Sequence, residues 1–111
     1  MEITEESAGG VCVVVARGRL DGSTSAMFSE RLEKLVGDQV KLLVDFSGVD
    51  FVTSAGLRAL LGIVKKVKAS SGVFAVCGVQ QSVCEILDIT GLTPMIKILS
   101  NRADALSALS T

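Results

Sequence analysis

Residues 44–61 read Val44-Asp45-Phe46-Ser47-Gly48-Val49-Asp50-Phe51-Val52-Thr53-Ser54-Ala55-Gly56-Leu57-Arg58-Ala59-Leu60-Leu61, and here a strand pattern passes directly into a helix pattern. The apolar run from Val40 to Phe46 predicts a buried β-strand, followed by a turn at Ser47-Gly48 and a short extended segment at 50–52. From Ser54 to about Ser70, apolar residues recur every three or four positions, which predicts an amphipathic helix. We therefore expect a strand–helix unit with the Thr53-Ser54-Ala55-Gly56 turn at its junction.

The remaining chain continues this alternation of strands and helices. Further strands are predicted at 3–6, 11–16, 73–77 and 95–99. A further helix is predicted to begin at a cap provided by Ser23, Thr24 or Ser25 and to end at Gly37-Asp38. Two more helices are predicted at 80–88 and at 101–110, the latter with Asn101 as its cap. A turn at Ala8-Gly9-Gly10 joins the first two strands as an antiparallel hairpin. Because parallel neighbours need helical crossovers, we expect an α/β fold with a mostly parallel sheet of about four to five strands and about four helices.

The length and composition predict a single domain over residues 1–111. Hydrophobic residues make up 49% of the chain and charged residues 21%, a balance that argues against disorder. The net charge of −1 and the absence of Tyr and Trp argue against nucleic acid and anionic membranes as partners. Since the N-terminal segment is acidic and no apolar run approaches the ~20 residues that span a bilayer, we expect a cytoplasmic protein.

The three cysteines, Cys12, Cys77 and Cys84, each lie in an apolar run. Their number is odd, and no C-x-x-C motif is present. A disulfide is therefore disfavoured, and reduced thiols packed as small apolar side chains are the expected state.

The chain contains no histidine, which excludes Ser-His-Asp and Cys-His nucleophilic sites and histidine metal sites. A Ser-Lys pair is disfavoured because Lys65, Lys66 and Lys68 lie three or more turns beyond Ser54. Asp45 and Asp50 could form a carboxylate pair, but residues that flank a turn are more simply explained as turn formers. No glycine-rich phosphate-binding motif is present. We therefore expect no enzyme activity, no cofactor and no metal.

Ser54 is the remaining candidate site, because it opens the strongest predicted helix. The first N–H groups of a helix lack partners and carry partial positive charge, so a phosphate on Ser54 would be favourably placed. The alternative is that Ser54 or Thr53 only caps the helix. Gly56, which has no side chain, would let the backbone of another chain approach closely.

Residues 44–61 strongly resemble the signature of STAS domains, the bacterial anti-sigma-factor antagonists. In that family a strand ends in an Asp-Leu-Ser-like turn, and a short hydrophobic segment leads to Asp-Ser-Ser/Ala/Thr-Gly-Leu and a long helix. Gly18-Arg19-Leu20-Asp21 resembles the family's Gly-x-Leu/Ile-Asp, and Asp88-Ile89-Thr90-Gly91-Leu92 resembles its motif after the third helix. The resemblance covers nearly the whole chain and implies a sheet with helices mainly on one side. One departure is Thr53, which stands where the family usually has Asp.

The resemblance also implies a function for Ser54, which matches the serine phosphorylated by a partner that is both a serine kinase and an anti-sigma factor. In the family, the unphosphorylated antagonist binds that partner and releases a sigma factor. Phosphorylation blocks the interaction, and a metal-dependent serine phosphatase restores it. Thr53 is the alternative acceptor. The residues expected to bind the partner are Asp21, Ser23, Asp50, Thr53, Ser54, Ala55, Gly56, Leu57 and Arg58.

Two other classes of function stay open at this point. STAS-like domains also occur as constitutive scaffolds in stressosome-type assemblies and in transport complexes, and the Thr53 substitution keeps that alternative. An enzyme is disfavoured because histidine and nucleotide-binding motifs are absent. In either non-enzymatic case we expect a monomer or a weak dimer.

Overall fold

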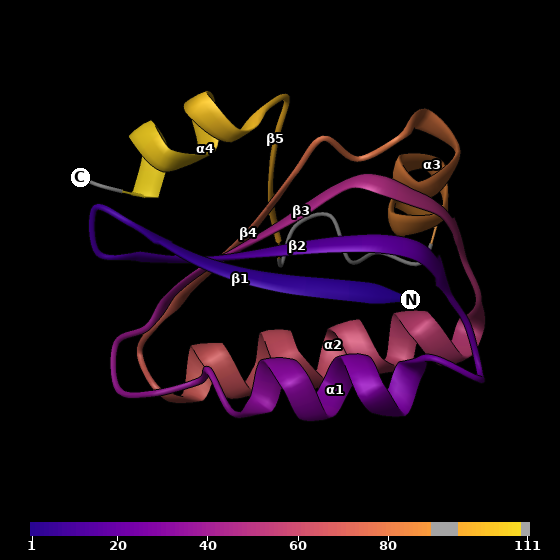
Figure 1. Cartoon of the computed structure of the whole chain (residues 1–111), viewed down its shortest axis with the longest axis horizontal. Coiled ribbons are helices and arrows are strands. Elements are labelled where there is room, and N and C mark those ends of the chain that lie inside the picture. The colour runs from indigo at the N-terminus through magenta and orange to yellow at the C-terminus, as the bar shows by residue number, and fades with distance from the viewer. Residues whose placement is uncertain (90–95, 110–111) are drawn as a thin grey trace.

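The computed structural model describes residues 1–89 and 96–109, which form a five-stranded sheet with helices on both faces (Figure 1). The strands lie in chain order across the sheet, as β1-β2-β3-β4-β5. The elements are β1 (Glu2–Ala8), β2 (Val11–Leu20), α1 (Ser25–Glu33), β3 (Lys41–Val52), α2 (Ser54–Ala69), β4 (Val73–Cys77), α3 (Gln81–Ile89), β5 (Lys97–Leu99) and α4 (Arg102–Leu109).

The first two strands form the predicted antiparallel hairpin, in which Ala8 pairs with Val11. Its loop is Gly9-Gly10, and both residues have positive φ angles, +56° and +81°. Two successive positive φ angles match the tight hairpin turns whose twist suits paired strands. The other three strand pairs are parallel, so the predicted mixed, mostly parallel sheet is confirmed.

Three of the four helices among the described residues contribute to one core, as expected. Helix α1 buries Phe28 and Leu32, and α2 packs beside it on the same face of the sheet (Figure 1). Helix α3 adds Val83 and Leu87 to this cluster. Helix α4 covers the opposite face, where Ala105 and Leu109 pack against strand residues such as Val13 and Ala75. None of the described helices is long and apolar enough to cross a membrane.

The turn predicted at Ser47-Gly48 is wrong, because β3 runs without a break to Val52. Strand β2 is also longer than predicted and extends through Leu20, so it gives β3 a partner along this whole length. The register shifts between Val15 and Arg17 and again between Gly18 and Arg19, and each shift adds one unpaired residue to β3. Turn-forming residues are therefore accommodated as β-bulges inside a continuous strand.

Several predicted helix boundaries also differ from the structure. Helix α1 ends at Glu33, before the predicted stop at Gly37-Asp38. Thr24 occupies its N-cap position, but its hydroxyl makes no cap bond; it accepts from the Asp21 N–H and donates to the Arg19 carbonyl. Asn101 does cap α4, since its side-chain oxygen accepts from the Asp104 N–H at 2.8 Å. The predicted ends at Met95 and Ser110 lie outside the described residues.

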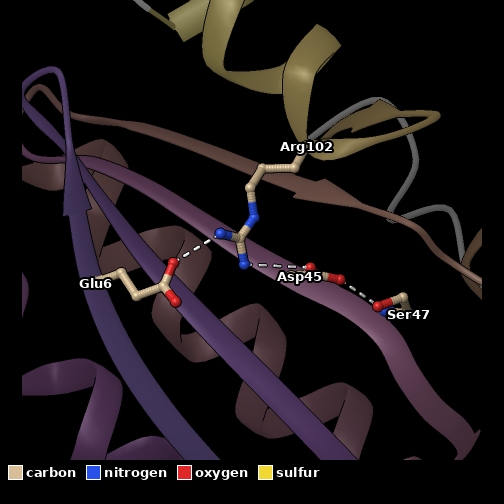
Figure 2. A network of polar contacts seen from close by, with 4 residues as sticks. All are labelled: Glu6, Asp45, Ser47 and Arg102. Atoms are coloured by element: carbon tan, nitrogen blue, oxygen red, sulfur yellow. Dashed lines mark hydrogen bonds and ion pairs between the residues drawn. The ribbon is translucent and has the colours of Figure 1, made fainter.

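An ionic network fixes α4 to the sheet (Figure 2). The guanidinium of Arg102 contacts the carboxylate of Glu6 on β1 at 2.6 Å and that of Asp45 on β3 at 3.6 Å. Asp45 also accepts a hydrogen bond from the Ser47 N–H at 2.9 Å, at the start of the first bulge. Because the Asp45 side chain is only 15% exposed, removal of these partners costs more than the loss of a partner at a fully exposed carboxylate.

We expect Arg102→Gln to lower the free energy of unfolding by about 1 kcal/mol, because Asp45 then lacks its cation. The matched control is Lys66→Gln, which removes an ion pair with Glu33 whose side chains are 53% and 43% exposed. The control should change stability by less than about 0.5 kcal/mol. Urea denaturation measures both, and equal effects would show that the network adds nothing beyond a surface ion pair.

Candidate functional site

The candidate site lies where two parallel strands end and two helices begin. Strands β2 and β3 are parallel neighbours, and each is followed by a helix, so the N-terminal ends of α1 and α2 lie at the same edge of the sheet (Figure 1). The Thr53 N–H donates a hydrogen bond to the Leu20 carbonyl at 3.0 Å. This bond places the turn that follows Leu20 beside the start of α2.

Two adjacent hydroxyls at the start of α2 have different surroundings. Thr53 is the N-cap residue, with extended backbone, and its Oγ1 accepts from the Gly56 N–H at 3.4 Å. Ser54 is the first helical residue and is exposed. Within residues 1–89 and 96–109, the structure gives the Ser54 hydroxyl no hydrogen-bond partner. Of the two residues considered as caps, Thr53 therefore caps the helix and Ser54 presents a free hydroxyl.

Gly56 leaves no room for a side chain, because its own chain lies against it. A Cβ atom there would lie 2.4 Å from the Leu20 carbonyl oxygen and 2.8 Å from Leu20 Cγ. Gly56 is buried, so the backbone that approaches it belongs to β2, whereas the sequence suggested a different chain. The missing side chain lets the first turn of α2 pack directly on the end of β2.

Asp21 organises the turn that follows Leu20 at the end of β2. Its Oδ1 accepts from the Ser23 N–H at 2.9 Å and from Ser23 Oγ at 2.6 Å, and it lies 3.3 Å from Thr24 Oγ1. The hydrogen bonds from Ser23, and secondarily those from Thr24, lower the pKa of Asp21 below its ordinary value. Asp21 is therefore a fixed negative charge at neutral pH, and the structure brings it and Ser23 together as predicted site residues.

Phe51 and Arg19 lie at the same edge, and the sequence analysis did not select them. Phe51 is 43% exposed, and Arg19 Cζ lies 4.9 Å from its ring centroid, a cation–π contact. The two residues pair in register across β2 and β3. The preceding residue, Asp50, is exposed at the second bulge. Because the bulge interrupts strand alternation, the sequence pattern gave no signal that Phe51 faces solvent.

The remaining predicted residues follow Ser54 on α2. Ala55 and Leu57 are half-buried, whereas Arg58 is exposed. Ser54 and Arg58 are four residues apart, which places them on one face of the helix. The accessible predicted residues at this edge therefore combine hydroxyls with charges of both signs.

The described residues support no carboxylate pair or metal site here. Asp45 binds Arg102 and the Ser47 N–H, while Asp50 lies in the second bulge, so the two do not flank a turn as predicted. Among the residues that the structure describes, no three His, Cys, Asp or Glu side chains are placed to hold a metal ion.

Comparison with known proteins identifies the family. The sequence profile of the STAS domain matches residues 2–105. The chain belongs to the STAS family. An anti-sigma F factor antagonist from Paenibacillus polymyxa is 30% identical, with 98% of this chain and 95% of the relative aligned.

Solved structures agree with this assignment. A STAS domain protein from Planctomyces limnophilus has a TM-score of 0.89 at 27% identity, with 98% of each chain covered. An anti-sigma factor antagonist from Mycobacterium paratuberculosis has a TM-score of 0.88 at 27% identity, covering 99% of this chain and 94% of that one. The expected STAS fold is therefore confirmed.

The contact at Gly56 predicts a strong effect of adding one methyl group to this STAS domain. Gly56→Ala should lower the free energy of unfolding by about 1–3 kcal/mol, because the new Cβ clashes with the Leu20 carbonyl. The control is Gly62→Ala on the same helix, where a Cβ meets nothing within 4 Å. That change should stabilise the domain by roughly 0.5–1 kcal/mol. Denaturant titration of both variants tests the contact, and a stabilising Gly56→Ala would contradict it.

The cysteines of this STAS domain are all free, as predicted. Burial, followed by the charge of Asp45, raises the pKa of Cys77 to about 11, although Arg102 acts in the opposite direction. At pH 8, iodoacetamide should therefore alkylate Cys77 far more slowly than the half-buried Cys84 in the native protein, and at a similar rate once urea unfolds the chain. Mass spectrometry of digested samples measures both rates, and rapid native labelling of Cys77 would contradict its burial.

Proposed function

We propose that this STAS domain is an anti-sigma factor antagonist whose partner binding is switched off by phosphorylation of Ser54. The observation that carries the proposal is the exposed Ser54 hydroxyl, which is left without a partner among the described residues because Thr53 caps the helix. The relative from Paenibacillus polymyxa, which aligns over nearly the full length of both chains, supports the antagonist function.

The proposed partner is an anti-sigma factor that is also a serine kinase. When Ser54 is unmodified, the domain binds this partner and a sigma factor is released. The kinase then transfers the γ-phosphoryl group of its ATP to Ser54 Oγ. A P–O bond forms on Ser54, the bond to ADP breaks, and the hydroxyl proton is released. A serine phosphatase reverses the modification by transferring the phosphoryl group to water.

The geometry favours Ser54 over Thr53 as the acceptor. The Thr53 hydroxyl already accepts the Gly56 N–H, and the residue is half-buried. A phosphate on Thr53 would disturb the cap of α2, whereas one on Ser54 adds charge to an exposed first turn where the helix N-terminus favours anions. Ser54 is therefore the proposed site of regulation, and Thr53 the proposed structural cap.

Electrostatics explains how a phosphate would end binding. It adds about −1.5 to −2 charges at neutral pH. The acidic residues predicted for this surface are Asp21, which is ionised, and the exposed Asp50. Moving such a group of charges from water into a protein interface is unfavourable unless the partner supplies cations. The modified domain therefore stays folded but loses affinity.

A constitutive scaffold is the second candidate function, and Thr53 is the observation that favours it, because the family usually has Asp at that position. A scaffold would bind its partner whether or not Ser54 is modified. Affinity capture from native lysate, followed by mass spectrometry, identifies the partner and shows whether Ser54, Thr53 or neither carries phosphate.

We expect Ser54→Ala to bind the captured partner within about threefold of the wild type but to resist inactivation by the kinase and ATP. Ser54→Asp should bind at least about tenfold more weakly, because it places a charge in the interface. The matched control is Ser82→Asp, which adds the same charge at an exposed serine in the first turn of α3. Isothermal titration calorimetry measures the affinities, and circular dichroism verifies folding. Full affinity of Ser54→Asp would contradict the switch and favour the scaffold.

A further inference from the structure

Helix α2 carries positive charge without any acidic residue. Residues 54–69 include Arg58, Lys65, Lys66 and Lys68 but no Asp or Glu, and the first turn has no acid. Helix N-termini carry partial positive charge and are normally stabilised by a nearby anion. With Thr53 in place of an acidic cap, the start of α2 contains neither a charged cap nor a negative side chain in its first turn.

Arg58 is the cation nearest in sequence to this end of the helix. It lies four residues after Ser54, a spacing that brings side chains together on one helix face. Long side chains in helices tend to lean toward the N-terminus, and for Arg58 that is the direction of Ser54. Lys66 has Glu33 as a partner at 2.7 Å, whereas Arg58 is exposed and has no ion pair among the described residues.

We infer that Arg58 is the intramolecular counter-cation of phosphorylated Ser54. The inference rests on the proposed modification of Ser54 and adds a residue that determines its consequence. An anion at the N-terminal position and a cation four residues later is the favourable order for a helical ion pair. The guanidinium fork also suits two oxygens of a phosphate, which a lysine binds only as a point charge.

The other charged residues at this edge do not replace Arg58. Arg19 lies on β2 and stacks on the Phe51 ring. Asp21 and Asp50 are acidic and would repel a phosphate rather than pair with it. Of the cations on α2, Arg58 is therefore the one that lies about one turn from Ser54, whereas the lysines lie three or more turns away.

The pairing of Arg58 with the phosphate would change the partner-binding surface in a second way. In the unmodified domain Arg58 is exposed, and the sequence analysis proposes it as one of the residues that bind the partner. In the phosphorylated domain it is held by the phosphate. One modification thus adds negative charge and also withdraws a cation from the partner surface, so the loss of affinity has two sources.

The test uses the full chain with phosphoserine inserted at position 54 during translation, so that no kinase is needed. Phosphorus-31 NMR then follows the second ionisation of the phosphate in the wild type, in Arg58→Gln and in the control Lys68→Gln. Lys68 is an exposed cation on the same helix, more than three turns from Ser54. Arg58→Gln should raise the phosphate pKa by about 0.2–0.4 unit, the size expected for losing one helical ion pair.

Four comparisons make the result specific. Lys68→Gln should leave the phosphate pKa at the wild-type value, and Arg58→Lys should recover part of the shift. At 1 M salt, where the Debye length is about 3 Å, the difference between the wild type and Arg58→Gln should shrink. Phosphorylation should also raise the melting temperature more in the wild type than in Arg58→Gln.

Equal phosphate titrations in the wild type, Arg58→Gln and Lys68→Gln would overturn the inference. That outcome leaves the proposed function intact, because the loss of binding caused by Ser54→Asp is measured separately. Conversely, if Ser54→Asp keeps full partner affinity, the proposed switch is wrong while the NMR result still decides whether Arg58 pairs with the phosphate.

Discussion

The rest of the structure depends on the contact between the end of β2 and the first turn of α2. The Leu20 carbonyl accepts the Thr53 N–H, and the same oxygen fills the space where any side chain at position 56 would start. This contact fixes where α2 begins and brings the Asp21 turn beside it. It also buries Gly56, so this glycine acts in the site through backbone packing, while the exposed chemistry comes from its neighbours.

With α2 starting at this contact, the hydroxyls of Thr53 and Ser54 have different surroundings. Because Thr53 supplies the cap, the proposed phosphorylation of Ser54 would leave the cap bond of α2 in place. A family in which the cap position is usually acidic would place a negative charge beside the serine. Here the first turn lacks one, so a phosphate on Ser54, as proposed, would meet no acidic side chain of that turn, and Arg58 would be the nearest cation on the helix.

The ionic network of Arg102 contacts the strand that leads into the site. Arg102 joins β1 and β3 through Glu6 and Asp45, and Asp45 in turn binds the Ser47 N–H at the first bulge (Figure 2). That bulge and the next shift β3 relative to β2 before the strand reaches Thr53. Strand β3 therefore both holds α4 on the sheet and carries the chain into the site.

The sequence by itself determined the elements, the hairpin, the mostly parallel sheet and Ser54 as the candidate site, because these depend on local periodicity, glycine turns and a short family motif. Only the tertiary structure decided that Ser47-Gly48 stays within a strand, that Phe51 is exposed and stacked with Arg19, and that Gly56 meets Leu20. Each of these features requires a partner more than 30 residues away or a strand register set by pairing. The physical reason is that turn composition permits either a turn or a bulge, and the length of the neighbouring strand selects between them.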